Sequence, residues 1–301
     1  MKRVVTDSFF DGVVGTLRRD EPLARYTSMH VGGPADLFFE IDDPADLPLL
    51  LSRCATEALP WIVLGRGSNL IVRDGGLRGL VIRLGRGFAG LRVDGPHVVA
   101  GAAVRVSQLL AEVERAGIGG FDFLTEIPAE VGGLIAMNAG IPGCEMRDVV
   151  ESIVVADAFG ARTVEAWAIG FGYRRVGLPP SSVVVEATLR GWPREPAAIR
   201  SDIDSRRARR RATQPTDAPN SGSMFKNPPG DRAGRLIDAA GLKGTSRGAI
   251  LVSTKHANFF VNKGGGSARD VLALVDLVRD RVKAQFGVNL EPEVHVIGED
   301  E

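Results

Sequence analysis

The sequence predicts an α+β protein made of several units, and three observations support this prediction. Strand, helix and strand patterns follow one another up to Gly85, a hairpin and a glycine-rich stretch come next, and another α+β pattern begins after Pro219. A chain of 301 residues is long enough for two or three domains of ordinary size. We therefore expect domains at 1–85, 86–195 and 196–290, followed by a C-terminal strand at 291–301 that returns to the body of the protein.

Short apolar runs and one capped helix define the first domain. The length and composition of these runs predict buried strands. The runs lie at 37–41, 61–64, 70–72 and 77–84. Asp43 followed by Pro44 is a typical helix start, because a proline in the first turn has no N–H group to leave unpaired. We expect this helix to end near Glu57.

A turn signal opens the second domain. The segment Asp94-Gly95-Pro96 separates apolar runs at 91–93 and 97–100, which is typical of a β-hairpin. Apolar residues spaced i, i+3, i+4 and i+7 then predict an amphipathic helix over 104–116. Further elements are expected later in the chain, namely strands at 149–156, 163–167 and 183–189 and a connecting helix over 193–211.

An amphipathic helix is the main feature of the third domain. Ser267 and Asp270 predict its start, because each side chain can bond the backbone N–H group of the other residue. The helix behind them has one apolar face, formed by Val271, Leu274, Val275, Val278 and Val282. A last strand is expected over 291–297.

Charge and cysteine content argue against several classes of function. The 37 basic and 37 acidic residues balance, so long-range attraction to nucleic acid or to an anionic membrane is not expected. Cys54 and Cys144 are too few for a disulfide framework or a metal cluster, which favours a cytoplasmic protein without a metal site. The first residues lack the pattern of a signal peptide, and no apolar run approaches the ~20 residues of a transmembrane helix.

Five arginines cluster at the end of the connecting helix. They are Arg206, Arg207, Arg209, Arg210 and Arg211. One interpretation is a phosphate-binding patch. The other is a solvated helix end, where cations interact favourably with the negative end of the helix dipole. The zero net charge of the chain favours the second interpretation.

A glycine loop directly follows the predicted strand at 61–64. In Gly65-Arg66-Gly67-Ser68-Asn69, the two glycines let the backbone approach an anion, and successive N–H groups can hold phosphate oxygens. The loop is not a Rossmann fingerprint, because a third glycine is missing and a strand follows instead of a helix. By itself it fits a phosphate site and an ordinary surface turn equally well.

A second glycine-rich run extends from Ile127 to Gly140. Its closely spaced glycines beside small apolar residues would let a flat ring lie against the backbone. Taken alone, this run fits a packed helix with close glycine contacts better.

Three short motifs lie far apart in the chain. They are Phe171-Gly172-Tyr173-Arg174, Asn220–Pro228 and Leu290-Glu291-Pro292-Glu293-Val294, and the segments Ala239–Gly244 and Lys255–Asn262 accompany them. Each alone is a weak signal, because an arginine or a late glutamate is usually a surface residue and a serine beside a glycine is usually part of a turn.

Taken together and in this order, the loops and motifs resemble the UDP-N-acetylenolpyruvoylglucosamine reductase family from about Tyr26 to Gly298. The resemblance implies a two-subdomain FAD-binding fold of the vanillyl-alcohol-oxidase type, followed by a C-terminal α+β substrate-binding domain. It also implies that bound FAD and NADPH serve to reduce UDP-N-acetylglucosamine enolpyruvate in peptidoglycan precursor synthesis. We expect no nucleic-acid, membrane or obligate protein partner.

The resemblance also assigns roles to individual residues. Arg174 matches the family's active-site arginine, Ser223 its proton donor and Glu293 its active-site acid. The expected FAD contacts are Gly65, Arg66, Gly67, Ser68, Asn69, Ile127, Pro128, Gly132, Gly133, Asn138 and Gly140. The expected substrate contacts are Tyr173, Lys226, Asn227, Lys255, His256 and Asn258.

The chemistry of the family explains why these residue types are needed. When hydride adds to the methylene carbon of an enolpyruvyl ether, negative charge builds on the adjacent carbon and spreads into the carboxylate. A guanidinium at Arg174 can hold that carboxylate, and the Ser223 hydroxyl suffices as a proton donor because a carbanion is a very strong base. Glu293 could donate a hydrogen bond to the enolate if it is protonated, or orient Arg174 if it is ionised.

The chain departs from the usual family pattern at three positions. Glu126 and Ala129 stand where glycine is usual, and Glu130 stands where a small hydroxyl residue is usual. A positive φ at Ala129 would cost ~1 kcal/mol, and Glu130 beside a pyrophosphate would repel it unless it turns outward. Only 49 positions separate Arg174 from Ser223, so we expect the shorter family form, which lacks an insertion bearing a tyrosine that covers the substrate.

Alternative functions are consistent with parts of the sequence. A different FAD oxidoreductase of the same fold, such as an oxidase, would keep both glycine loops without needing Ser223, and its reduced flavin would react with oxygen. A flavin-free nucleotide-sugar-binding protein would account for Glu126, Ala129 and Glu130, and it would be colourless when purified. Nucleic-acid binding through 206–211 is a more distant alternative, and salt-sensitive retention on DNA would reveal it.

Overall fold

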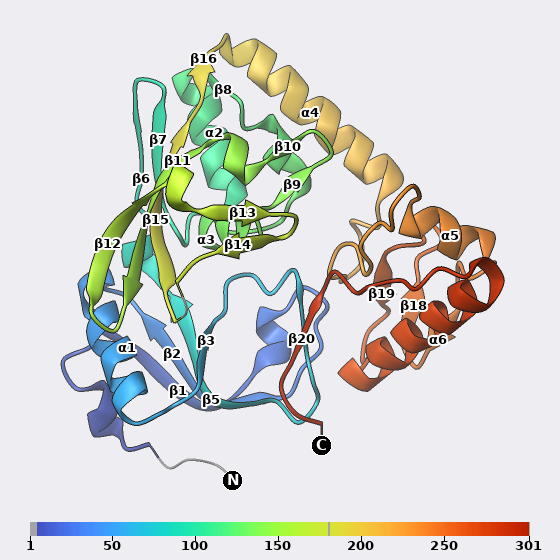
Figure 1. The fold of residues 1–301 in the computed structure, drawn as a ribbon, viewed down its shortest axis with the longest axis horizontal. Helices are drawn as coiled ribbons and strands as arrows, with labels where there is room; N and C mark the ends of the chain where they lie inside the picture. Colours follow the sequence, from blue (N-terminus) through green and yellow to red (C-terminus); the bar gives the residue numbers. More distant parts are fainter. Residues whose placement is uncertain (1–4, 180, 301) are drawn as a thin grey trace. The chain divides into compact units, whose positions relative to one another are not determined.

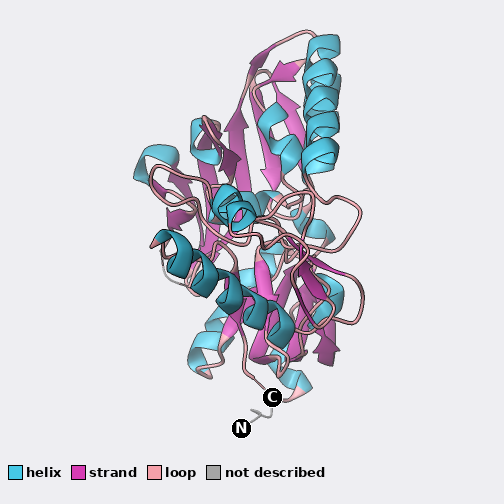
Figure 2. Ribbon diagram, turned by 90° about the vertical axis from the view of Figure 1, so that its right-hand side faces the viewer, coloured by secondary structure: helices cyan, strands magenta, loops and turns pink. Residues whose placement is uncertain are grey.

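The computed structural model describes residues 5–179 and 181–300. Helices, strands and loops alternate along the chain, as the labelled ribbon of Figure 1 and the colouring of Figure 2 show. The chain divides into two compact units, each made of discontinuous segments. Unit 1 comprises the chain up to Arg18, Phe38–Arg66 and Gly79–Ala208, whereas unit 2 comprises Arg19–Leu37, Gly67–Arg78 and the chain from Arg209 onward. The three predicted domains are continuous segments and do not correspond one to one to these two units. The predicted domain boundaries therefore stay a prediction.

A four-stranded sheet has the order β1-β2-β5-β3. Its strands are β1 (Gly15–Pro22), β2 (Pro34–Ile41), β3 (Trp61–Val63) and β5 (Leu77–Leu84). The sequence does not predict β1, because most of its side chains are polar and several are exposed. The predicted helix forms as a 3-10 turn at Pro44–Asp46 followed by α1 (Leu47–Thr56), and Asp43 accepts a hydrogen bond from the N–H group of Ala45 at 2.9 Å.

A five-stranded antiparallel sheet in unit 1 has the order β12-β11-β15-β7-β6. Its strands are β6 (Leu91–Asp94), β7 (His97–Gly101), β11 (Val150–Asp157), β12 (Gly160–Glu165) and β15 (Val183–Arg190). The strand predicted at 163–167 is wrong in its bounds, because β12 begins at Gly160 opposite Asp157 and Trp167 lies in a 3-10 turn. Gly160 has a φ of 141°, which permits a tight hairpin turn that the expected strand did not include.

Helices and short two-stranded ribbons complete unit 1. Helix α2 (Val106–Ala116) matches its prediction and buries its apolar stripe in the core together with α3 (Val131–Ala136). Each such aliphatic side chain stabilises the fold by roughly 1.5–3 kcal/mol when it is fully buried. The ribbons pair β8 (Ile118–Gly119) with β16 (Trp192–Pro193), β9 (Gly140–Ile141) with β10 (Cys144–Glu145), and β13 (Gly170–Gly172) with β14 (Arg175–Gly177). The connecting helix α4 (Pro196–Thr213) buries Ile199 and Ile203 in the same core.

Unit 2 contains a three-stranded antiparallel sheet and two helices. The sheet has the order β17 (Ser246–Arg247), β18 (Ile250–Val252) and β19 (Phe260–Asn262), and the helices are α5 (Ala233–Ala239) and α6 (Ala268–Phe286). The predicted capping box at the start of α6 is confirmed, since Ser267 and Asp270 exchange backbone-to-side-chain hydrogen bonds of 3.1 Å. The predicted apolar face of α6 is buried in the unit 2 core.

The end of the chain pairs with the segment that follows the first glycine loop. The strand β20 (His295–Ile297) is shorter than the predicted 291–297, and it runs parallel to β4 (Leu70–Val72) within unit 2. The residues just before β20 do not form a continuous strand. Pro292 instead makes an isolated β-bridge with Phe225. The C-terminus thus contributes to the environment of the glycine loop.

The described part of the chain lacks two features that would indicate a membrane or metal-binding function. Within residues 5–179 and 181–300, no helix has both the length and the apolar character needed to cross a bilayer. In the same residues, no group of three or more His, Cys, Asp or Glu side chains is placed to hold a metal ion.

Candidate active site

The first glycine loop presents consecutive unpaired backbone donors. Among the described residues, the N–H groups of Gly65, Arg66, Gly67 and Ser68 donate to no other group of the chain. Gly67 has a φ of 56°, and a Cβ atom there would lie 2.4 Å from the carbonyl oxygen of Tyr26, so only glycine fits. Successive free N–H groups form an anion site, which suits the diphosphate of FAD.

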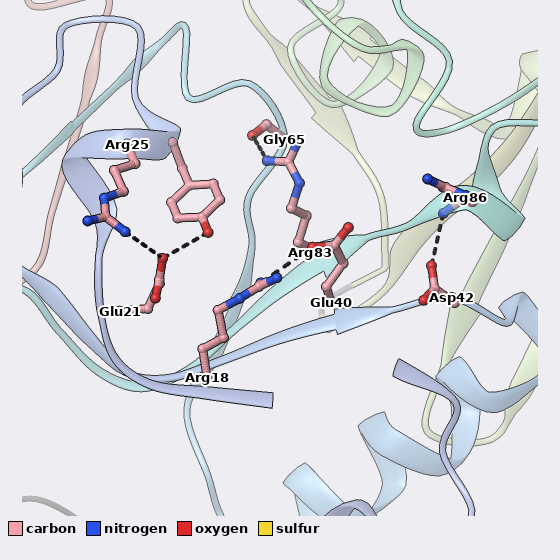
Figure 3. A network of polar contacts seen from close by, with 9 residues as sticks. Arg18, Glu21, Arg25, Glu40, Asp42, Gly65, Arg83 and Arg86 are labelled. Carbon is pink, nitrogen blue, oxygen red and sulfur yellow. Dashed lines mark hydrogen bonds and ion pairs between the residues drawn. The ribbon is translucent and has the colours of Figure 1, made fainter. Parts of the chain in front are cut away.

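Glu130 lies against this loop instead of turning outward. A Cβ atom at Gly65 would be 3.1 Å from its Oε2 atom, and only 12% of the Glu130 side chain is exposed. Arg83 approaches its Oε1 atom at 3.8 Å. Arg83 also donates a hydrogen bond to the Gly65 carbonyl at 3.4 Å (Figure 3). Burial raises the pKa of Glu130, an effect that the positive charges of Arg83, Arg66 and Arg105 oppose. Glu130 therefore brings a partly buried acid to the loop, and three arginines act on its carboxyl group.

Sequence reasoning missed Arg83. It comes from β5, well after the loop in the sequence, and its strand is otherwise mostly apolar. A charged residue inside an apolar strand is the signal that could have identified it.

Ala129 does not carry the strain that the sequence comparison raised. Among the described residues, the non-glycine positions with positive φ do not include Ala129. Glu126 points to α4, where Arg206 lies 3.7 Å from its Oε1 atom and 2.6 Å from Asp122. Local structure thus accommodates Glu126 and Ala129, two of the three departures from the family pattern. Of the three, Glu130 is the residue that places a negative charge at the loop.

We expect Glu130→Gln to strengthen FAD binding by about tenfold at pH 8, because removing one negative charge near a diphosphate is worth roughly 1.4 kcal/mol. The raised pKa means that Glu130 takes up a proton at a higher pH than an ordinary carboxyl. Its anionic form should therefore be lost as the pH falls, and FAD affinity of the unmodified protein should rise toward that of the variant. Titrating apoprotein with FAD by fluorescence at several pH values measures this.

Glu126→Gln is the matched control for that experiment, because Glu126 is paired with Arg206 instead of facing the loop. It should leave the pH dependence of FAD affinity unchanged. Equal pH dependence in the unmodified protein and the Glu130 variant would rule out Glu130 as its source.

The second glycine run provides an open backbone surface. Gly132 packs close to Ala102, since a Cβ atom on it would lie 3.0 Å from the Ala102 Cβ atom. The neighbouring Gly133 is exposed, and a Cβ atom there would meet nothing within 4 Å. Ile127 packs against the unit 1 core, whereas Pro128 is exposed. A surface without side chains fits a flat ring, so both loops fit FAD, although the negative charge of Glu130 is unfavourable beside a diphosphate.

Arg174 lies at the tip of the β13–β14 hairpin. Gly172 pairs with Arg175, which leaves Tyr173 and Arg174 as the two turn residues. Arg174 has a φ of 54°, which is uncommon for a residue with a side chain and often marks a functional position. Its Nη2 atom donates to the carbonyl of Gly140 at 3.1 Å, and its guanidinium carbon lies 5.4 Å from the centre of the exposed Tyr173 ring.

Asn138 and Gly140 are buried residues of unit 1 that form hydrogen bonds with this hairpin. Asn138 is fully buried, so its side chain is not open for the cofactor contact expected from the sequence. Its amide instead bonds Gly172 and Glu145, and Gly140 accepts from Arg174. Both residues therefore support the predicted active-site arginine.

Ser223 and Glu293 lie on neighbouring backbone segments of unit 2. The N–H group of Glu293 donates to the carbonyl of Met224 at 2.9 Å, and Ser223 forms an antiparallel bridge with Phe259. Asn69, at the end of the first glycine loop, donates from its side-chain amide to the Glu293 carbonyl at 3.3 Å. The predicted proton donor, the predicted acid and the end of the loop thus share one hydrogen-bonded scaffold.

Asn258 holds the backbone beside Ser223. Its Oδ1 atom accepts from the N–H group of Phe225 at 3.0 Å, and its Nδ2 atom donates to the Phe225 carbonyl at 2.8 Å. Its own carbonyl accepts from Met224 at 2.8 Å, and the residue is only 3% exposed. These contacts hold the backbone on which Ser223 lies, and the substrate contact expected of Asn258 stays a prediction.

We expect Asn258→Ala to lower the free energy of unfolding by about 2–4 kcal/mol, because it leaves the buried N–H and C=O groups of Phe225 unsatisfied. Urea unfolding followed by circular dichroism measures this. Asn227→Ala is the matched comparison, since Asn227 is exposed and its side chain accepts one bond, from Ala233 at 3.1 Å. It should cost at most about 1 kcal/mol. Similar losses in both variants would contradict a special role for Asn258.

The predicted substrate lysines are exposed or half-buried and engaged with the chain. The Nζ atom of Lys226 lies 3.2 Å from the Glu291 carboxylate, an exposed pair that contributes little to stability. The Nζ atom of Lys255 donates to the carbonyl of Arg211 at the end of α4. Both lysines lie in unit 2, and their contact with substrate stays a prediction.

His256 has structural contacts within unit 2. Its Nδ1 atom accepts from the N–H group of Asn258 at 3.2 Å, and its ring meets that of Phe259 edge-on at 4.8 Å. Burial lowers its pKa, so the ring is neutral near pH 7. A neutral histidine that accepts a backbone hydrogen bond supports the turn before Asn258.

Comparisons with known proteins agree with this arrangement. A family model described as "UDP-N-acetylenolpyruvoylglucosamine reductase, C-terminal domain" matches residues 214–297, and one described as "FAD binding domain" matches residues 35–164. A UDP-N-acetylenolpyruvoylglucosamine reductase of Anaeromyxobacter sp. (strain Fw109-5) is 45% identical over 287 residues, which cover 95% of this chain and 90% of the relative. The protein of the same name from Geobacter sulfurreducens is 43% identical over 288 residues, which cover 96% of each chain.

A solved structure extends the similarity to the fold. The crystal structure of UDP-N-acetylenolpyruvylglucosamine reductase from Thermus caldophilus matches with a TM-score of 0.81 and 37% sequence identity. The match covers 94% of this chain and 99% of that one. The predicted fold class, an FAD-binding fold with a C-terminal α+β domain, is therefore confirmed.

Proposed function

The chain belongs to the UDP-N-acetylenolpyruvoylglucosamine reductase family, and from this premise we propose how its residues perform the reaction. It is an FAD-dependent oxidoreductase that uses NADPH to reduce UDP-N-acetylglucosamine enolpyruvate to UDP-N-acetylmuramate. This product is a precursor of peptidoglycan. We place the reaction in the cytoplasm, where NADPH is available and the free thiols of Cys54 and Cys144 stay reduced.

The cofactor site consists of the two glycine segments. The free N–H groups of Gly65, Arg66, Gly67 and Ser68 would hold the FAD diphosphate, and the open backbone at Gly133 would receive part of its flat surface. When bound there, FAD supplies the hydride that NADPH first donates. The protein's task is to orient the substrate and to supply the proton.

Three residues complete the chemistry. Arg174 binds the substrate carboxylate and stabilises the negative charge that spreads into it, because a guanidinium forms strong paired hydrogen bonds with carboxylates. Ser223 then donates its hydroxyl proton to the carbon next to that carboxylate. Glu293 either donates a hydrogen bond to the same enolate or orients a neighbouring cation.

One observation supports this assignment most directly. Ser223 and Glu293, which lie 70 positions apart in the sequence, occupy neighbouring backbone segments that Asn69 connects to the end of the glycine loop. A proton donor, an acid and a phosphate-binding loop on one scaffold are what a flavin-dependent reduction of an enol ether requires.

An absorbance experiment tests the function. Purified protein should show a flavin band that bleaches when NADPH is added without oxygen, and the band should return when UDP-N-acetylglucosamine enolpyruvate is added. Return of the band with oxygen but not with the nucleotide sugar would indicate an oxidase instead. A protein that shows no flavin band even after incubation with FAD would contradict the cofactor assignment.

A further inference from the structure

Arg174 sits on a short ribbon that needs external support. The hairpin β13–β14 consists of three pairs, from Gly170 opposite Gly177 to Gly172 opposite Arg175. An isolated two-stranded hairpin of this size is marginal in water. The place of the Arg174 guanidinium is therefore decided by what the hairpin touches.

Asn138 provides that support through three hydrogen bonds. Its Nδ2 atom donates to the carbonyl of Gly172 at 3.1 Å and to the Glu145 carboxylate at 2.8 Å. Its Oδ1 atom accepts from the N–H group of Arg147 at 3.0 Å. One fully buried side chain thus joins the hairpin to the segment 145–147.

The segment that contains Asn138 also binds the guanidinium group of Arg174. Two residues after Asn138, the carbonyl of Gly140 accepts from the Arg174 guanidinium at 3.1 Å. A Cβ atom at Gly140 would lie 2.3 Å from the Cys144 carbonyl oxygen, so glycine is required for the close pairing of β9 with β10 that places this carbonyl. Arg174 is therefore fixed at its backbone through Gly172 and at its side chain through Gly140.

The backbone of Asn138 fits this role at some cost. Its φ of 40° lies in the left-handed region, which asparagine enters more readily than most residues. Such strain persists where surrounding contacts determine the conformation, as the three side-chain bonds do here.

We infer that Asn138 is a positioning residue for Arg174, whose hydrogen bonds place the guanidinium to receive the substrate carboxylate. The inference rests on the proposed function, since it requires that Arg174 bind that carboxylate. The inference assigns Asn138 to the support of the substrate-binding arginine, whereas the sequence predicted a contact with FAD.

A double-mutant cycle tests the inference. Asn138→Gly removes the side chain while glycine accepts the positive φ, and Asn138→Asp keeps the shape but loses both donated bonds. Each should retain bound flavin and its reduction by NADPH within about twofold. Each should slow flavin reoxidation by the enolpyruvyl substrate about tenfold or more, and each should have no further effect in an Arg174→Ala background.

Asn262→Ala is the matched control. Asn262 is also buried and bonds Met29, Gly264 and Gly266 with its side chain, but it lies in unit 2. The fold-changes that Asn262→Ala and Arg174→Ala cause in the reoxidation rate should multiply in the double variant, as expected for independent sites.

The outcomes separate the inference from the function on which it rests. An equal loss from the Asn138 variants with and without Arg174 would show that Asn138 acts independently and would overturn the inference. Flavin-free Asn138 variants would also overturn it, because they would return Asn138 to the cofactor site. If Arg174→Ala itself reoxidises at the normal rate, the proposed role of Arg174 is wrong and the inference is wrong with it.

Discussion

Ser223→Ala should slow flavin reoxidation by the enolpyruvyl substrate by at least about 100-fold, the range typical for loss of a positioned proton donor. Reduction of the flavin by NADPH needs no proton from this residue, so it should change less than about twofold. Anaerobic stopped-flow absorbance resolves the two half-reactions. The rate of reoxidation, and not only the affinity for substrate, should fall, because the hydroxyl acts on the carbanion formed during the reaction.

Ser221→Ala is the control, since it removes a hydroxyl two positions away. Ser221 is 2% exposed and its Oγ atom has no hydrogen-bond partner among the described residues, so both half-reactions should stay near normal. Equal slowing of both half-reactions by Ser223→Ala would contradict its role as the proton donor and would indicate a disturbed site.

Gly67→Ala should weaken FAD binding at least about 100-fold, whereas Gly65→Ala should weaken it far less. A Cβ atom at Gly67 would lie 2.4 Å from the Tyr26 carbonyl oxygen and 2.8 Å from the Thr27 Cα atom, and the φ of 56° adds strain. The loop must then change its backbone and lose the arrangement of N–H donors. At Gly65 a Cβ atom would meet only the end of the Glu130 side chain, at 3.1 Å, which can move.

Equilibrium titration of apoprotein with FAD compares the two variants, and circular dichroism verifies that each is folded. Equal losses in both would show that the loop needs only its side-chain-free surface and not the conformation of Gly67. Normal FAD binding by a folded Gly67→Ala protein would place the diphosphate elsewhere.

The fold follows from the sequence where local signals are strong. Helix α6 has a capping box and an apolar stripe of helical period, and both appear in the structure. The bounds of β5 match because a mostly apolar segment, interrupted by Arg78, Gly79 and Arg83, lies between glycine turns. The prediction fails for β12, where a glycine turn shifted the strand, and for β1, whose side chains are mostly polar and whose pairing depends on a distant neighbour. Strand pairing is a long-range property that local patterns do not contain.

The candidate site divides in a similar way. The sequence alone determined which residue types are present and in which order, and hence the family. The catalytic trio Arg174, Ser223 and Glu293 stays a prediction from its motifs. The order of motifs along a chain does not depend on geometry, so the family can be identified without a structure.

Only the tertiary structure decided which polar side chains are buried and bonded to the backbone. Asn138 and Asn258 appear in motifs as equal candidates for ligand contact, yet both are buried and bonded to backbone groups. The sequence does not show that Arg83 is a neighbour of Glu130, because the two residues are far apart in the chain and β5 brings the arginine to the loop. Burial and hydrogen-bond pairing depend on segments far apart in the chain, and a buried amide must satisfy its donors and acceptors wherever the fold places them.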